Sequence, residues 1–128
     1  LAYFVLSAVA AAAFYVVAVL VAPVLLGEAF HSAIGLLPYT MLAIMLQGHF
    51  VHNLKFLHFD GRIELMSVLS AFTIGLNLWL SILWAKQMGI SGIILAAAVS
   101  FGAAFIMSGI LILGRWMPLR KGARAVAG

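Results

Sequence analysis

Residues 47–62, QGHFVHNLKFLHFDGR, join two long apolar spans, and their position at the membrane determines the orientation of the whole chain. This stretch holds three of the four histidines and two of the seven basic residues. Its last five residues, HFDGR, form a short polar turn, and the sequence on either side of the stretch is apolar and nearly uncharged. We expect the turn to lie at a membrane surface, so that its side of the membrane fixes the orientation of the other segments.

The composition indicates an integral membrane protein. Of 128 residues, 66% are hydrophobic and 8% are charged, whereas about a quarter of the residues of a soluble domain are charged. Apolar spans at 1–26, 33–57, 63–85 and 90–114 each exceed the roughly 18 residues that mark a transmembrane helix. The predicted fold class is therefore all-α, with four transmembrane helices in residues 1–114 and a basic tail over residues 115–128. Because Leu1 already lies in an apolar run, we expect the chain to be a piece of a longer protein.

The positive charges predict the orientation. If successive turns face alternate sides of the bilayer, Lys86 lies on one side and the other six basic residues lie opposite it. The positive-inside rule assigns the richer side to the cytoplasm, together with Asp60 and the C-terminal tail. The six residues are Lys55, Arg62, Arg115, Arg120, Lys121 and Arg124.

Several function classes are disfavoured. The basic residues lie at span ends and not on a soluble face, which argues against nucleic acid as a partner. The chain has no cysteine, which excludes disulfides and thiolate chemistry. It also has no HExxH, GxxxxGK[ST] or GxGxxG motif and no nucleophile–base pair. We therefore expect no enzyme activity, no metal and no cofactor.

The third span carries a polar stripe. Ser70, Thr73, Asn77 and Ser81 lie within about 80° of one another on a helical wheel, and Thr73 and Asn77 fall near the middle of the span. An amide at that depth needs a partner or water. The stripe either lines a hydrated cavity or forms hydrogen bonds with another helix.

The second span concentrates histidines. His49, His52 and Asn53 share an arc of about 100°, while Gln47 points away from them. Either histidine could carry protons, or it could be neutral and hydrogen-bonded to a neighbouring helix. A bis-histidine haem is disfavoured, because both candidates lie on one helix.

The fourth span has a small residue at every fourth position, which predicts close helix packing. These residues are Gly92, Ala96, Ser100, Ala104 and Ser108.

Three segments resemble the polysaccharide flippases, the oligosaccharidyl-lipid branch of the multidrug/oligosaccharidyl-lipid/polysaccharide exporter superfamily. Residues 23–30, PVLLGEAF, look like that family's P-hydrophobic-G-E-x-F helix end. Residues 77–92 resemble its N-x-x-x-N … I-P-x-x-G-x-x-G-A-A element, with Ser81, Lys86 and residues 93–94 differing from it. Ala96, Ser100 and Phe101 continue the pattern in the positions of A-T-x-x-S-Y.

The resemblance implies a MATE-like transporter of twelve to fourteen helices in two bundles, of which this chain would supply the last four. Such a protein moves an undecaprenyl-pyrophosphate-linked oligosaccharide across the bacterial inner membrane by alternating access. Its partners would be the lipid bilayer, the lipid-linked oligosaccharide and the remaining helices. Contacts with the sugar would fall to cavity-lining residues, for which the candidates are Gln47, Asn53, Thr73, Asn77 and Ser81. His49 and His52 would sense protons. The alternatives are a multidrug exporter of the same superfamily and a non-transport four-helix membrane anchor or cytochrome subunit.

Overall fold

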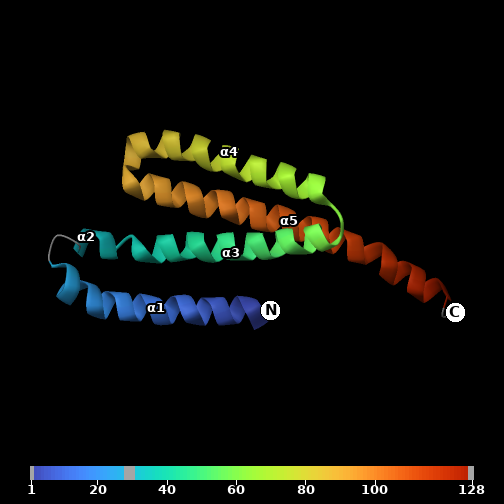
Figure 1. Cartoon of the computed structure of the whole chain (residues 1–128), viewed down its shortest axis with the longest axis horizontal. Coiled ribbons are helices and arrows are strands. Elements are labelled where there is room, and N and C mark those ends of the chain that lie inside the picture. The colour runs from blue at the N-terminus through green and yellow to red at the C-terminus, as the bar shows by residue number, and fades with distance from the viewer. Residues whose placement is uncertain (1, 28–30, 127–128) are drawn as a thin grey trace.

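The computed structural model describes residues 2–27 and 31–126, without the side chains of residues 26, 32 and 115–126. Every regular element in these residues is a helix (Figure 1). The helices are α1 (Ala2–Leu26), α2 (His31–Ile34), α3 (Leu37–Phe59), α4 (Ile63–Met88) and α5 (Ile90–Val126). The predicted all-helical fold is therefore confirmed. Residues 28–30 of the PVLLGEAF segment and Leu1 lie outside the described residues.

Two boundaries differ from those expected. The second span was predicted over residues 33–57, with Pro38 as a kink in its first turns. Instead, α3 begins at Leu37, so Pro38 stands in the first turn, where its missing N–H breaks no intrahelical bond. The last span was predicted to end at residue 114, and the backbone of α5 continues as one helix to Val126. The apolar segment itself is Ile90–Gly114, and the basic tail over residues 115–128 stays a prediction.

Glycines form the turns between the long helices. Gly61 follows α3 with φ +72°, and Gly89 ends α4 with φ +62°. A side chain is strained at such angles, so glycine is the residue that lets the chain leave one helix and enter the next at once. Only residues 60–62 separate α3 from α4, and only Gly89 separates α4 from α5. Turns this short make consecutive helices run in opposite directions.

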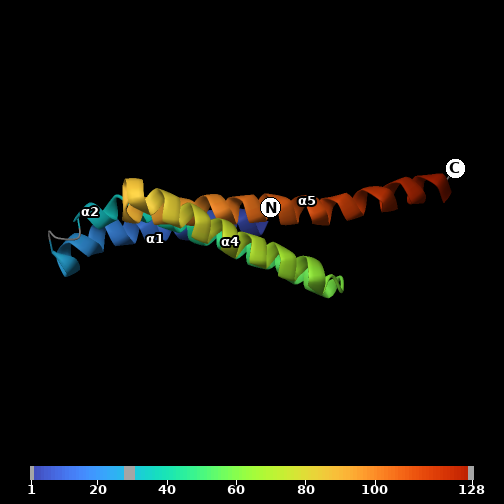
Figure 2. The ribbon, with the colours of Figure 1, turned by 90° about the horizontal axis from the view of Figure 1, so that it is seen from above.

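The four long helices run alternately in opposite directions. Viewed as in Figure 1, they follow the order α4, α5, α3, α1 from top to bottom. Helix α5 packs along both α3 and α4, while α3 and α4 contact each other little and α1 contacts α3 only loosely. Seen from above, the start of α4 diverges from α5 (Figure 2). The last helix in sequence is therefore the one that holds the layer together.

The small residues of α5 explain its central position. Ala96, Ser100, Ala104 and Ser108 are 0% exposed, and Gly92 is also buried. Their spacing of four puts them on one side of α5, where the small side chains let α3 and α4 each pack close to α5. Around this contact lies the apolar core, formed by Phe50, Leu57, Leu69 and Ala104. The predicted packing stripe is confirmed.

Most of the apolar surface faces outward. The chain exposes 9043 Å², whereas a water-soluble folded chain of its mass exposes about 6600 Å². Helix α1 contributes much of this area, with large side chains such as Leu20 and Val24 at 69% and 83% exposure. A bilayer or further protein must cover a surface of this kind. The molecule is an all-helical, membrane-embedded protein.

Three of the four predicted spans are long and apolar enough to cross a membrane. They are Ala2–Leu25, Ile63–Met88 and Ile90–Gly114. Helix α3 has 23 residues and lies between α1 and α5 (Figure 1), but its second half carries glutamine, asparagine, lysine and three histidines, which lower its hydropathy. The polar side chains of α3 therefore need specific partners within the protein.

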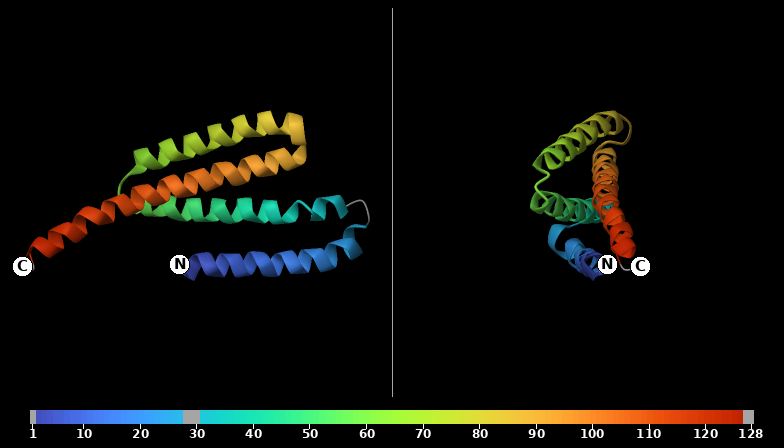
Figure 3. Two further views of the ribbon diagram at one scale, coloured as in Figure 1. Left: turned by 180° about the vertical axis from the view of Figure 1, so that it is seen from behind. Right: turned by 90° about the vertical axis from the view of Figure 1, so that its right-hand side faces the viewer.

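The two ends of the layer differ in charge. The α3–α4 turn and the end of α5 lie at one end, and the α4–α5 turn with Lys86 lies at the other, as the view from behind also shows (Figure 3). At about 1.5 Å per residue, α5 is roughly 55 Å long, and its basic last part projects past the other helices. Successive turns between the helices thus lie at alternate ends of the layer, as the prediction of orientation from the positive charges assumed.

Candidate functional site

His49 lies where three helices meet. It is on α3 and only 5% exposed, and its Nε2 is 3.0 Å from Ser7 Oγ of α1. The ring of Phe4 stacks on the imidazole with centroids 4.8 Å apart, and Phe105 of α5 lies 5.6 Å away. This arrangement matches the alternative in which the histidine is hydrogen-bonded to a neighbouring helix. Among the described residues, no other side-chain hydrogen bond joins α1 to another helix.

Tyr3 joins the two histidines of α3. Its ring stacks on His52 with centroids 4.9 Å apart and meets His49 edge-on at 5.0 Å. His52 also contacts Phe56 edge-on at 5.0 Å. Because His49 is buried and His52 is exposed, the tyrosine lies between an enclosed imidazole and an accessible one.

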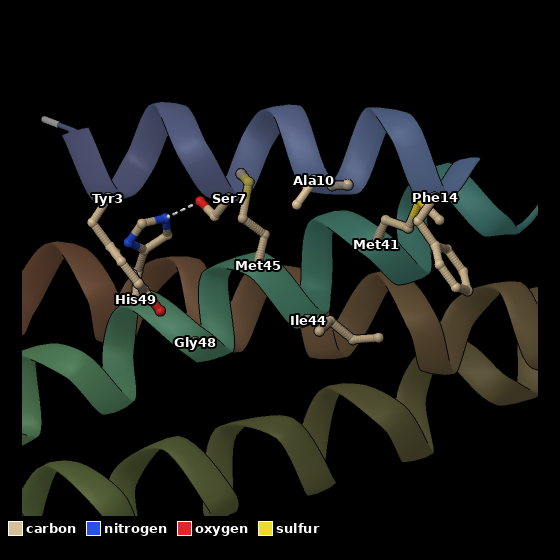
Figure 4. A pocket seen from close by; sticks show the side chains of 10 residues that line it. Tyr3, Ser7, Ala10, Phe14, Met41, Ile44, Met45, Gly48 and His49 are labelled. Atoms are coloured by element: carbon tan, nitrogen blue, oxygen red, sulfur yellow. Dashed lines mark hydrogen bonds between the residues drawn. The ribbon is translucent and has the colours of Figure 1, made fainter. Parts of the chain in front are cut away.

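A hollow of about 370 Å³ lies between α1 and α3 beside His49 (Figure 4). Ser7, His49 and Tyr3 form its polar end, and the rest of its wall is apolar. Met41 and Phe14 lie at the far end in Figure 4. Its volume is within the range of small-molecule sites, which are mostly apolar with a few directed polar groups.

A second hollow is bordered by Tyr3, Ile44 and Gly48, which also line the first. It has a volume of about 340 Å³ and brings together Gln47, His52 and Lys55, one from each of three successive turns of α3. Gln47 had been expected to point away from the histidines. The hollow lies between Gln47 and His52, so both line it although they lie on different sides of the helix.

Asn53 ties α3 to α5. Its Nδ2 donates to Ser108 Oγ at 2.9 Å, and the Ser108 hydroxyl in turn donates to the carbonyl oxygen of Phe105 at 3.0 Å. An amide that would be costly in the bilayer is thereby satisfied. Asn53 therefore acts first as an interhelical contact, and its predicted role in binding a sugar stays a prediction.

Two hydroxyls of the polar stripe form hydrogen bonds within their own helix, α4. Thr73 is buried and donates to the carbonyl oxygen of Leu69 at 2.7 Å, and Ser81 Oγ donates to Asn77 Oδ1 at 3.0 Å. Neither bond reaches another helix, because a hydroxyl four residues on finds an acceptor on its own helix. The stripe lines a hollow of about 270 Å³ together with Phe101 of α5.

The predicted site residues thus fall into separate places. Gln47, His49, His52 and Lys55 surround the α1–α3 hollows, Thr73, Asn77 and Ser81 line the α4 hollow, and Asn53 lies at the α3–α5 contact. Asp60 and Arg62 lie in the α3–α4 turn, where their N–H groups donate to the carbonyl oxygens of Phe56 and Leu57 at 3.0 Å. Within the described residues, no three His, Asp or Glu side chains come together as a metal site would require.

Sequence reasoning missed the aromatic partners of the histidines. Tyr3, Phe4 and Phe105 surround His49, yet they are separated from it by more than 40 positions. The only signal in the sequence is indirect: small residues lie along one side of the first span, which suits close helix packing, and they are Ser7, Ala11, Ala18 and Ala22. The same row supplies the hydrogen bond to His49.

No family model matches the chain, and no match was found among curated proteins or solved structures.

Proposed function

We propose that the chain is part of a transporter that flips an undecaprenyl-pyrophosphate-linked oligosaccharide across the bacterial inner membrane by alternating access. The observation that carries the proposal is the α4 stripe of Thr73, Asn77 and Ser81. These polar residues belong to a helix that is apolar enough to span the membrane, and they border a hollow. Polar groups at membrane depth mark substrate or ion pathways when they face a cavity.

The chemistry of the stripe suits a glycan. Asn77 accepts one hydrogen bond from Ser81 through Oδ1, and its Nδ2 makes no hydrogen bond with the described residues. An amide N–H₂ supplies two donors, which match the hydroxyl oxygens of a sugar. Phe101 on the opposite wall provides an aromatic surface for the apolar face of a pyranose ring.

The loosely packed α1 suits a protein that changes shape. Helix α1 rests on α3 through small residues, one hydrogen bond and the rings around His49, with a hollow beside them. Contacts this sparse can be exchanged at low cost, as a rocking or gating step requires. His49 and His52 are the groups that would link such a movement to a proton.

The test is export of a lipid-linked glycan. A bacterial strain that lacks its own flippase is complemented with the gene that encodes this chain, and surface polysaccharide is quantified. The gene should restore export, and Asn77→Ala should lower the initial rate about fivefold, as expected for one lost hydrogen bond of about 1 kcal/mol. The matched control is Ser67→Ala, which removes a hydroxyl from an exposed part of α4.

Two failures are separable in this experiment. If the unsubstituted gene restores no export, the glycan substrate is wrong. If it restores export and Asn77→Ala performs like Ser67→Ala, the transporter assignment stands and the α4 stripe is not its sugar-binding surface.

A multidrug exporter of the same superfamily is a second candidate. The largely apolar hollow between α1 and α3 favours it, because methionine and aromatic side chains suit apolar cargo of varied shape. Energised efflux of a fluorescent lipophilic cation, without glycan export in the complemented strain, would select this candidate.

A further inference from the structure

A fourth surface hollow lies at the basic end of the layer, between the last turns of α3 and the first turns of α4. Its volume is about 560 Å³, and its wall consists of Val51, Leu54, Lys55, His58, Phe59 and Met66. It shares Val51 and Lys55 with the hollow of about 340 Å³ but is closed by Met66 of α4 in place of Tyr3 of α1. Neither the α4 stripe nor the His49 contacts take part in it.

Apolar side chains and the charged side chain occupy different parts of this hollow. Leu54 and Met66 are half-buried at its wall, and Phe59 is 85% exposed at its rim. Lys55 is exposed and lies about 6 Å along the helix axis from Phe59, the last residue of α3. A lysine at this depth extends its amine toward the headgroup layer while its methylenes stay among apolar groups.

Charge distinguishes this end of the protein from the other. Six basic residues belong to it, namely Lys55, Arg62 and four in residues 115–124, against two acidic residues, Asp60 and Glu64. The difference of four equals the formal net charge of the whole chain, +4. The backbone of α5 continues beyond the other helices on this same side (Figure 1), and residues 115–124 belong to the last part of this helix.

We propose that the hollow between α3 and α4 binds an anionic glycerophospholipid, with an acyl chain along Leu54 and Met66 and the phosphate at Lys55. An apolar wall with a cation at headgroup depth fits a lipid better than a soluble anion, because basic pockets between transmembrane helices on the positive side bind lipid headgroups. This inference does not depend on the proposed transport function.

The test is a lipid titration of the full chain followed by native mass spectrometry. Phosphatidylglycerol is compared with phosphatidylcholine of the same acyl chains, and the dissociation constant of the first bound lipid is measured. Phosphatidylglycerol should bind more tightly, and Lys55→Ala should weaken it roughly fivefold, the value of one basic contact near an anionic headgroup. Lys86→Ala is the matched control at the opposite end, and it should leave binding unchanged.

A second variant tests the apolar half. Met66→Trp fills the hollow without altering charge and should weaken phosphatidylglycerol binding while the helical circular dichroism stays that of the parent.

Four results would overturn the proposal. The first is equal binding of the two lipids, and the second is a Lys55→Ala chain that binds like the parent. The third is loss of binding only when the four basic residues of 115–124 are neutralised together, which would move the site to the α5 extension. The fourth is full displacement of the lipid by millimolar inorganic phosphate, which would identify a site for a free anion.

Discussion

Replacing Gly92 with alanine should separate α4 from α5 at their tightest contact. A Cβ at this position would lie 2.6 Å from the carbonyl carbon of Trp84 and 2.9 Å from its Cβ, with the carbonyl oxygen nearer still. These are mostly backbone atoms, so no side-chain rotation relieves the overlap. Overpacking of this kind costs about 1–3 kcal/mol, and alanine returns at most about 1 kcal/mol of helix propensity. We expect a net loss of up to about 2 kcal/mol in the free energy of unfolding.

Two other helical glycines provide matched controls for this substitution. A Cβ at Gly75 or Gly109 would have no neighbour within 4 Å, so alanine there should leave the free energy of unfolding unchanged or raise it by up to about 1 kcal/mol. The assay is unfolding of the purified chain in mixed micelles with increasing sodium dodecyl sulfate, followed by circular dichroism. If Gly92→Ala is as stable as Gly109→Ala, α5 does not approach α4 as closely as the structure indicates.

Three further predictions concern packing and orientation. Ala104→Leu should lower the free energy of unfolding by about 1–3 kcal/mol in the same assay, because Ala104 is 0% exposed; an unchanged value would contradict the central place of α5. Asn53→Ala should lower the free energy of unfolding by about 0.6 kcal/mol and at most about 1.7 kcal/mol. A double-mutant cycle with Ser108→Ala should show coupling between the two residues, whereas additive losses would mean that their hydrogen bond is absent. Because the chain has no cysteine, a membrane-impermeant maleimide added to intact cells should label Gln87→Cys and spare Asp60→Cys, and the reverse pattern would invert the proposed orientation.

The sequence predicted the features that depend on the residues of a single helix. Small residues at every fourth position of α5 predicted a packed side, and burial of Ala96 and Ala104 confirms it. Hydropathy located three spanning helices, and the predicted polar turn HFDGR contains Gly61, at which the chain leaves α3. The start of the second helix was placed four residues early, because the apolar run includes residues 33–36, which precede α3.

The contacts between helices were not predictable in the same way. Nothing in the order of residues indicates that Ser7 faces His49 or that Asn53 faces Ser108, because each pair depends on how two helices are rotated about their axes. The polar stripe of α4 shows the same difficulty. A helical wheel placed Thr73 and Ser81 on one side correctly, but it could not show that their hydroxyls bond within their own helix.

The central position of α5 has a consequence for biosynthesis. Helices α3 and α4 touch each other little, and the surface that unites them belongs to the segment that the ribosome makes after both. Each earlier helix therefore enters the bilayer as a nearly independent unit and waits for the last one. Until then the side chain of Asn53 has no Ser108 hydroxyl to accept its hydrogen bond, so α3 completes its polar contacts only when the last helix arrives.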